Sequence, residues 1–130
     1  MLKILAVSGS LRAASYNSAL LRLAIESAPP ELTIERYDIR AIPFYDGDVE
    51  KRGDPQTVVD WKDSISAADG ILFATPEYHH SIPGVLKNAL DWAGRSPKGV
   101  TNASLARKPI AIMGTGGVAG TARAQLHLRQ

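Results

Sequence analysis

The sequence predicts an α/β fold in which a parallel sheet is covered by helices on both faces. Three short and nearly continuous apolar runs, at residues 4–7, 70–74 and 109–113, are typical of strands buried on both sides. Segments with apolar residues at helical spacing separate these runs, and such alternation predicts parallel strands joined by right-handed crossovers. A chain of 130 residues, 45% of them hydrophobic, is long enough for one such domain. We therefore expect a single domain over residues 1–130, built as a three-layer, doubly wound sheet.

The first half of the chain contains two predicted strands and two predicted helices. In chain order we expect a strand at 4–7, a helix over 17–28, a strand at 32–39, a loop at 42–48 and a helix over 56–68. The first helix has one apolar stripe and ends at Pro29-Pro30. The second strand mixes charged with apolar residues, as strands near a sheet edge do. We expect the aromatic residues of the loop to pad the core and Trp61 to be partly buried.

The second half repeats the pattern with two apolar strands, each followed by a polar or glycine-rich loop. In chain order we expect a strand at 70–74, a loop at 75–81, a helix from Pro83-Gly84 to about Arg95, a loop at 96–108, a strand at 109–113, glycines at 114–117 and a helix from about Ala119. The basic residues of the 96–108 loop are expected to be solvated. Lys87 and Asp91 are expected to form a surface pair on the third helix.

Composition and charge exclude several classes of protein. With 15 basic and 13 acidic residues the net charge is +2, and no run of Lys or Arg indicates a nucleic-acid or membrane partner. Cysteine is absent, which excludes disulfides and thiolate chemistry and is compatible with a cytoplasmic location. The N-terminal apolar run is too short for a signal peptide, and no segment is long enough to span a bilayer.

The polar stretch at residues 8–17 lies between the first predicted strand and the first predicted helix. It contains Ser8, Ser10, Arg12, Ser15 and Asn17. A helix N-terminus presents unpaired N–H groups and partial positive charge, so a phosphate there would meet donors on several sides. Taken singly, each Ser or Asn is better explained as a helix cap or turn residue. The stretch lacks the three glycines of a dinucleotide fingerprint and the Gly-Lys-Ser/Thr end of a P-loop, so the cluster indicates a mononucleotide.

The run Gly9-Ser10-Leu11-Arg12, with Ser15 and Asn17, resembles the phosphate loop of the NADPH-dependent FMN reductase family. This family comprises flavodoxin-like quinone, azo-dye and chromate reductases. The resemblance implies a flavodoxin-like fold and FMN as the cofactor. It also implies a set of residues around the FMN phosphate, namely Ser10, Arg12, Ser15, Tyr16 and Asn17.

A second and longer run resembles the most characteristic segment of the same family. It reads Pro76-Glu77-Tyr78-His79, followed by Ser81, Pro83-Gly84 and Leu86-Lys87-Asn88-Ala89-Leu90-Asp91-Trp92. The resemblance implies that the backbone of 76–79 meets the pyrimidine edge of the flavin, with Tyr78 beside the ring. His79 stands where the family usually has Asn, which is harmless if the contact is through the backbone and alters flavin affinity if it is not. The His79-His80 pair has no third ligand at a recognisable spacing, so no metal site is expected.

The third loop, Gly114-Thr115-Gly116-Gly117, resembles the remaining flavin contact of the family, where small residues let the backbone approach the ring. Glycines after a strand are also common turn signals. The stronger argument comes from the three loops together. Each follows an apolar strand, and the carboxyl ends of parallel strands meet on one rim, where ligands of such sheets bind.

The resemblance covers essentially the whole chain, and family members continue past Gln130 with another strand and helix. In the family strand order, 2-1-3-4-5, the apolar strand at 109–113 would then lie at an exposed edge. We therefore expect a C-terminally truncated form of a longer protein, which pairs this edge with another chain or is less stable than a longer version. A homo-oligomer, either a dimer or a tetramer, is expected.

The function that the resemblance implies is an NAD(P)H-dependent FMN oxidoreductase that passes electrons to quinones, azo compounds, chromate or similar small molecules. NADPH or NADH would be the donor. Because the flavin carries the chemistry, no side chain is predicted to act as an acid, base or nucleophile. Two alternatives remain: a flavodoxin-type carrier that exchanges electrons only with proteins, which the near-neutral charge disfavours, and a non-catalytic fragment that self-associates.

Overall fold

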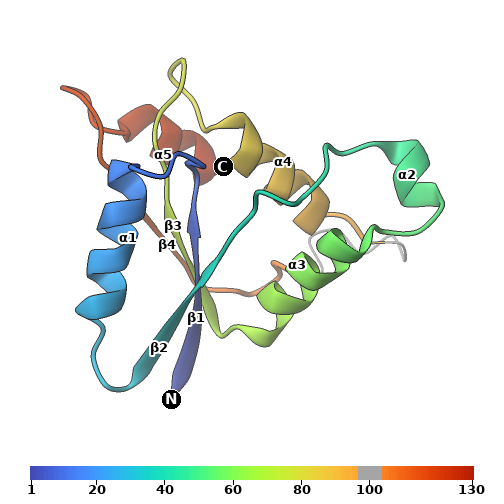
Figure 1. Ribbon diagram of the computed structural model, residues 1–130, viewed down its shortest axis with the longest axis horizontal. Helices are drawn as coiled ribbons and strands as arrows, with labels where there is room; N and C mark the ends of the chain where they lie inside the picture. Colours follow the sequence, from blue (N-terminus) through green and yellow to red (C-terminus); the bar gives the residue numbers. More distant parts are fainter. Residues whose placement is uncertain (97–103) are drawn as a thin grey trace.

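A computed structural model describes residues 1–96 and 104–130, and within these ranges it contains a four-stranded parallel sheet with helices on both faces (Figure 1). The strands are β1 (Leu2–Ser8), β2 (Leu32–Tyr37), β3 (Gly70–Ala74) and β4 (Ile110–Met113), in the order β2-β1-β3-β4. The helices are α1 (Tyr16–Glu26), α2 (Gly47–Lys51), α3 (Gln56–Ala67), α4 (Gly84–Ala93) and α5 (Ala122–Leu128). The predicted α/β class and the edge position of the second strand are confirmed.

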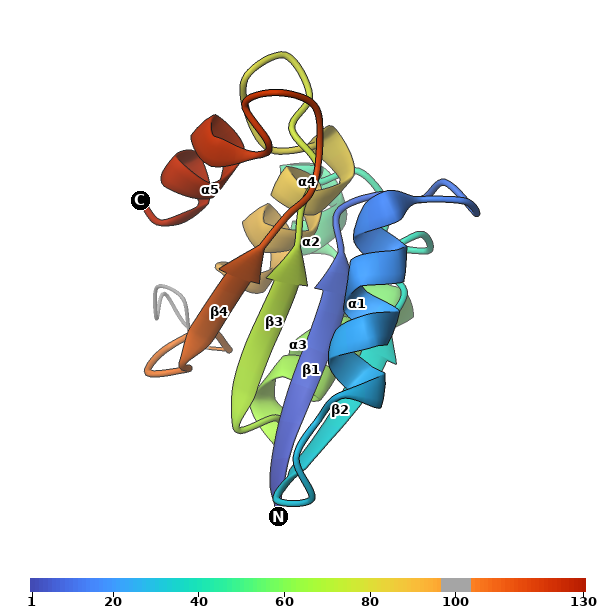
Figure 2. The same ribbon diagram turned by 90° about the vertical axis from the view of Figure 1, so that its left-hand side faces the viewer.

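The register of the sheet brings the carboxyl ends of its strands to one rim. Val7 of β1 pairs with Tyr37 of β2 on one side and with Phe73 of β3 on the other. Ala74, at the end of β3, pairs with Met113 at the end of β4. In Figure 2 the chain leaves β1, β3 and β4 at the same end of the sheet. The strand order reverses between β1 and β3, which is where ligands bind in doubly wound sheets.

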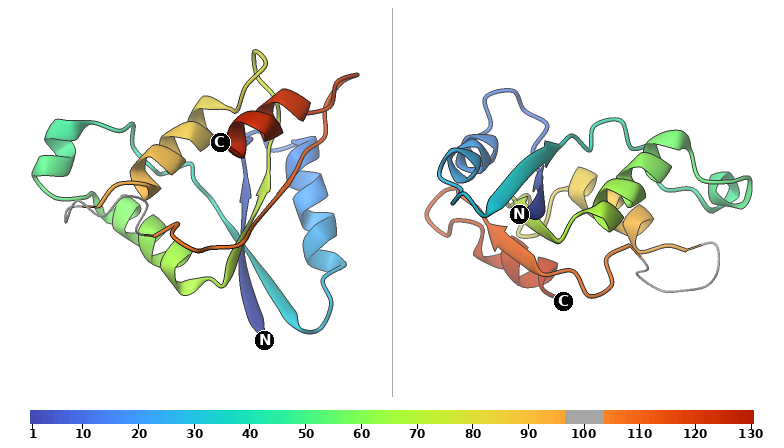
Figure 3. Two further views of the ribbon diagram at one scale, coloured as in Figure 1. Left: turned by 180° about the vertical axis from the view of Figure 1, so that it is seen from behind. Right: turned by 90° about the horizontal axis from the view of Figure 1, so that it is seen from below.

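The two faces of the sheet have cores of different size. Because successive strand residues point to opposite faces, Val7 and Phe73 belong to the larger core, which includes Trp61 of α3 and Trp92 of α4. The opposite face carries a smaller cluster with Leu21 of α1. The two views of Figure 3 show α1 on the side of the sheet opposite α3 and α4. The small residues on the α1 side let this helix lie close to the strands that carry the site.

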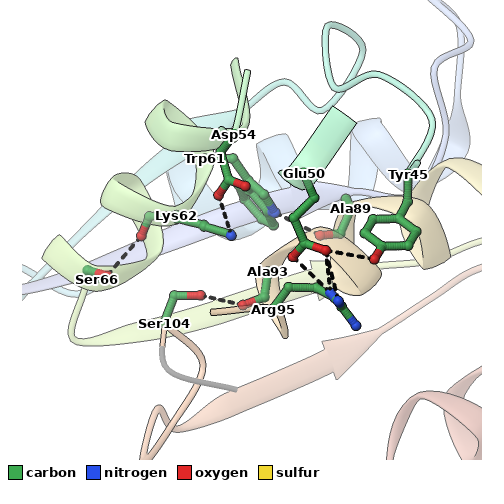
Figure 4. A network of polar contacts seen from close by, with 10 residues as sticks. All are labelled: Tyr45, Glu50, Asp54, Trp61, Lys62, Ser66, Ala89, Ala93, Arg95 and Ser104. Atoms are coloured by element: carbon green, nitrogen blue, oxygen red, sulfur yellow. Dashed lines mark hydrogen bonds and ion pairs between the residues drawn. The ribbon is translucent and has the colours of Figure 1, made fainter. Parts of the chain in front are cut away.

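Trp61 is fully buried, so the prediction of partial burial is wrong. Its indole N–H donates to the carbonyl of Ala89 over 2.8 Å, which satisfies the one polar group that the ring carries (Figure 4). The helical spacing placed Trp61 on the inner face of α3, but the hydrogen-bond partner on α4 lies 28 residues away. Sequence alone therefore underestimated how deeply the ring sits.

The segment predicted as a loop at 42–48 leads into a short helix, α2, that the sequence analysis missed. Asp46 caps this helix by accepting a hydrogen bond from the N–H of Asp48 over 2.8 Å. Tyr45 packs edge-on against Trp92, as the padding interpretation expected, with ring centroids 5.0 Å apart. Phe44 does not pad the core, because its side chain is 85% exposed.

Glu50 of α2 is tied to the end of α4 by an ion pair and to Tyr45 by a hydrogen bond (Figure 4). The Arg95 guanidinium lies 2.8 Å from the Glu50 carboxylate, and the Tyr45 hydroxyl donates to the same carboxylate over 2.8 Å. Hydrogen bonds from Arg95, and then from Tyr45, lower the pKa of Glu50 to about 2. Arg95 also lies over the Tyr45 ring, 5.1 Å from its centroid.

β4 forms the other edge of the sheet, as the family strand order implied, and its first residue, Ile110, is 47% exposed. The final helix begins at Ala122 instead of Ala119, because a turn at 117–120 with Gly120 at φ +59° precedes it.

Residues 97–103 of the predicted basic loop lie outside the described ranges. Lys108 at its end donates to the carbonyls of Ser66 and Ala68 at the C-terminus of α3, so this cation is not merely solvated. Within the described residues, no helix is both long and apolar enough to cross a membrane.

Candidate functional site

The loops after β1, β3 and β4 enclose a cavity of about 460 Å³ at the carboxyl end of the sheet. Its volume lies in the range of roughly 300–1,000 Å³ that is usual for small-molecule sites. The cavity is lined by Ser10, Arg12, Ser15, Tyr16, Asn17, Pro76, Glu77, Tyr78, His79, His80, Thr115, Gly116, Gly117, Val118, Ala119 and Gly120. The structure thus brings together every predicted binding residue except Gly114.

Buried serines shape the first loop from beneath. Ser8 and Ser18 are at most 5% exposed, and the Ser18 hydroxyl donates to the Ser8 hydroxyl over 2.9 Å. The N–H of Ser10 donates to the Ser8 hydroxyl over 3.2 Å, and the N–H of Arg12 donates to the Ser10 hydroxyl over 3.3 Å. Ser15 caps α1 by accepting from the N–H of Ser18. The loop is therefore held in shape before any ligand binds.

The guanidinium of Arg12 in the first loop is placed where it could bind an anion. Within the described residues the Arg12 guanidinium makes no hydrogen bond or ion pair, and it lines the cavity beside Ser10 and Ser15. The first N–H groups of α1 have no partner within the helix and point the same way. Hydroxyls, free N–H groups and a guanidinium together make a donor set that fits a phosphate.

Close backbone contact joins the first loop to the second. Gly9 donates its N–H to the carbonyl of Ala74 over 2.8 Å. A Cβ at Gly9 would lie 3.1 Å from Pro76 and 3.3 Å from the Thr75 hydroxyl, so a larger residue would push the two loops apart. Glycine at this position therefore allows both loops to border one cavity.

The second loop is a tight hairpin whose two central residues adopt left-handed backbone conformations. Tyr78 and Ser81 exchange two backbone hydrogen bonds of 3.0 and 3.1 Å, while His79 and His80 have φ values of +49° and +63°. Positive φ at both central positions defines a type I′ turn, which favours Asn and Gly. The two histidines thus occupy strained positions, and Tyr78, 50% exposed, lies on the cavity wall.

Side chains of the hairpin hold α5. The Glu77 carboxylate is largely buried and accepts a hydrogen bond from the N–H of Ala124 in the first turn of α5, over 2.9 Å. Arg123 lies 2.7 Å from Nδ1 of His80, and the Ser81 hydroxyl lies 2.9 Å from Nδ1 of His127. Glu77 therefore stabilises the positive end of a helix dipole. Its carboxylate faces α5, and Glu77 is also one of the residues that line the cavity.

The third loop borders the cavity with Thr115, Gly116 and Gly117, of which two are glycines. Gly117 has no atom within 4 Å of the position of a Cβ, so this part of the wall is open. Gly114 does not line the cavity, because its missing side chain makes room for Thr121, whose Oγ1 would lie only 2.0 Å from a Cβ. Asn17 of α1 exchanges two hydrogen bonds with the backbone of Thr115, of 2.9 and 3.1 Å.

Sequence reasoning missed four residues of the cavity wall: His80, Val118, Ala119 and Gly120. His80 was weighed only as a metal ligand, and the φ that places it at the wall is a feature of the folded hairpin. The turn at 117–120, closed by the N–H of Gly120 donating to the carbonyl of Gly117 over 2.8 Å, was taken for the start of the last helix. Gly120 was the available signal, because glycine commonly marks such turns. Among the described residues, no three His, Cys, Asp or Glu side chains converge.

Comparisons with known proteins agree with this arrangement of loops. The family model for NADPH-dependent FMN reductases matches residues 2–130. An NAD(P)H-dependent FMN reductase from Pseudomonas aeruginosa is 52% identical over 130 residues, which cover 99% of this chain and 68% of that protein. An NADPH:quinone oxidoreductase from Arabidopsis thaliana is 45% identical, over 100% of this chain and 66% of that protein.

The fold also resembles the solved structure of a flavoenzyme. The flavoenzyme NAD(P)H:(acceptor) oxidoreductase FerB from Paracoccus denitrificans superposes with a TM-score of 0.89 at 36% identity, covering 98% of this chain and 69% of FerB. The chain therefore spans about two thirds of the length of these relatives.

Proposed function

Because the chain belongs to the NADPH-dependent FMN reductase family and has its flavodoxin-like fold, we propose that it binds FMN at the carboxyl end of its sheet. Its activity would be the NAD(P)H-dependent reduction of small molecules such as quinones. The single observation that carries this proposal is the cavity itself, which a phosphate-type donor set and the loops after β3 and β4 border together. Relatives named as FMN and quinone reductases support the same activity.

We assign the phosphate to the start of α1. Ser10, Arg12 and Ser15 supply hydroxyls and a guanidinium there, and Tyr16 adds an N–H of the first helical turn. A preformed cradle lowers the entropic cost of binding, because the serine network already orders the loop.

We assign the ring to the two loops that follow β3 and β4. Pro76, Glu77, Tyr78 and His79 line the cavity, and Tyr78 offers an aromatic surface there. Thr115, Gly116 and Gly117 let the opposite wall approach a flat ligand closely.

When bound, FMN accepts hydride from a reduced nicotinamide and passes electrons to the acceptor. The chain's own residues bind the cofactor and orient it, and none is assigned as an acid or base. The open wall at Gly117 would leave room for the electron donor and the acceptor to approach the ring one after the other.

We further propose that the protein works in the cytoplasm as a homo-oligomer.

Anaerobic stopped-flow absorbance tests this activity against the electron-carrier alternative. NADPH or NADH should bleach the flavin absorbance of the FMN-loaded protein, and menadione should then restore it. A protein that holds FMN but stays oxidised with both nicotinamides would instead support an electron carrier. A protein that binds no FMN would overturn the proposed function altogether.

A further inference from the structure

Asn17 differs from its neighbours in the first loop, because its side chain already forms hydrogen bonds with another part of the cavity. It lies in the first turn of α1 and is 4% exposed. Its Nδ2 donates to the carbonyl of Thr115 over 3.1 Å, and its Oδ1 accepts from the N–H of Thr115 over 2.9 Å. The two residues are 98 positions apart in the sequence.

Asparagine suits this pair of bonds, because it carries one donor group and one acceptor group on a short side chain. The partner peptide offers one donor and one acceptor, so the side chain must supply one of each in a fixed plane. Aspartate lacks the donor, a serine hydroxyl is too short to span both groups, and glutamine is longer by one methylene. Within the described ranges, these two bonds are the only hydrogen bonds between α1 and the loop at 114–120.

Among the described residues, the loop that Asn17 holds makes no other hydrogen bond to α1. It follows β4, which pairs only with β3 in the sheet that residues 1–96 and 104–130 form, and it contains glycines on both sides of Thr115. Glycine-rich backbone loses more entropy than other backbone when it is ordered, so a bidentate clamp at its centre has a large effect on its position. The Arg12 guanidinium, in contrast, has no hydrogen-bond partner within residues 1–96 and 104–130 that would compete with a phosphate.

We propose that Asn17 is a positioning residue for the ring-binding loop at 114–117 and not a ligand of the phosphate. This inference rests on the proposed function, because it presupposes that the cavity takes FMN. Arg12 and Asn17, which the sequence places in the same loop, then have different roles. Arg12 recognises the phosphate, and Asn17 positions the loop against which the ring lies. These two roles predict different responses to FMN and to riboflavin, which lacks the phosphate.

Titration calorimetry and flavin-fluorescence quenching with FMN and with riboflavin test the proposal. Asn17→Ala should weaken both ligands by a similar factor, on the order of tenfold, because both lose a correctly placed ring wall. Arg12→Ala should weaken FMN by a factor on the order of tenfold and riboflavin little. If Asn17→Ala weakens FMN alone, or leaves both affinities unchanged, the proposal is wrong.

Asn88→Ala is the matched control for a general loss of stability. Asn88 forms an equivalent clamp far from the cavity lining, since it donates to the carbonyl of Pro43 over 2.9 Å and accepts from the N–H of Tyr45 over 2.8 Å. Its variant should lower Tm about as much as Asn17→Ala while both flavin affinities stay at the wild-type level. Equal losses of flavin affinity in the two variants would assign the effect of Asn17 to stability alone and overturn the proposal.

Amide hydrogen exchange of the unmodified protein keeps the proposal testable if Asn17→Ala does not fold. Without any ligand, the N–H of Thr115 should be protected, and in a folded Asn17→Ala variant it should exchange at least about tenfold faster. An unprotected Thr115 amide in the unmodified protein would show that the clamp does not form. Failure of the unmodified protein to bind either flavin would instead reject the proposed function, whatever the exchange data show.

Discussion

Arg12 is the residue on which discrimination between phosphorylated and unphosphorylated ligands should depend. Arg12 lines the cavity, and its guanidinium has no partner among the described residues. Arg12→Ala should weaken FMN binding by about 1–3 kcal/mol through the loss of charge-assisted hydrogen bonds. Titration calorimetry measures this change.

Two comparisons sharpen the Arg12 experiment. Riboflavin should bind the variant and the unmodified protein almost equally, because it offers nothing for the guanidinium to contact. Raising the salt concentration should reduce the difference between the two proteins for FMN, since a partly exposed ion pair is screened. Equal losses for FMN and riboflavin would remove Arg12 from the phosphate site.

His79 carries a conformational cost that a single substitution can remove. With φ at +49°, it occupies the first central position of a type I′ turn, where Asn is favoured. His79→Asn should raise the free energy of unfolding by about 0.5–1 kcal/mol, because Asn tolerates the left-handed region better. Thermal melts should show a Tm higher by a few degrees.

His79→Ala is the control, since alanine removes the imidazole without relieving the backbone. It should leave Tm unchanged or lower it, and His79→Val should lower it further because β-branched residues adopt positive φ poorly. If the Asn and Ala variants melt together, backbone strain at this position is not what limits stability.

At the scale of elements, α2 is held to the end of α4 by charge. The Arg95 ion pair, and then the Tyr45 hydrogen bond, lower the pKa of Glu50 from 4.5 to about 2. A carboxyl with a depressed pKa stabilises the fold above its unfolded-state value and loses this contribution as the pH falls toward its folded-state value. The pair should therefore stabilise the protein at neutral pH and weaken between pH 4.5 and about 2.

Glu50→Gln tests this acid-sensitive contribution. The variant should be less stable than the unmodified protein at about pH 7, and the difference should shrink as the pH approaches about 2. Urea denaturation at several pH values measures the free energy of unfolding of both proteins. Arg95→Ala should show the same narrowing difference, because it removes the main cause of the pKa shift. Stability curves that stay parallel across this pH range would contradict the assignment.

At the scale of the whole molecule, β4 is an unprotected edge. Within the described part of the chain it pairs with β3 alone, and its residues, Ile-Ala-Ile-Met, include no charge and no proline. Ile110→Lys should shift the 130-residue protein toward the monomer, because a lysine on an edge strand disfavours pairing with a second strand. Light scattering over a range of concentrations measures this shift.

Leu23→Lys is the matched control for added charge. Leu23 is 58% exposed on α1, against 47% for Ile110, and it lies away from the β4 edge. Its variant should associate as the unmodified protein does. A protein that is monomeric at every concentration with Ile at position 110 would show that this edge does not mediate association.

The sequence by itself determined the alternation of elements and the three loops of the cavity. Apolar runs predicted β1, β3 and β4, and the mixed run at 32–39 predicted an edge strand. These patterns are readable because burial on one or both faces imposes a local periodicity on the residues. The rim on which the cavity lies followed from the strand ends, which a parallel sheet must gather on one side. The individual residues of the wall were implied by the family resemblance.

Only the tertiary structure decided what individual polar side chains do. Asn17 clamps Thr115, Glu77 caps α5, and Trp61 finds its acceptor on α4. Each of these partners is at least 28 positions away in the chain. A hydrogen bond of this kind depends on distances of a few tenths of an ångström between elements, whereas periodicity specifies only which face a residue occupies. The residue types at the site can therefore be predicted from the sequence. The contacts that each of them makes depend on the fold, which brings distant residues together.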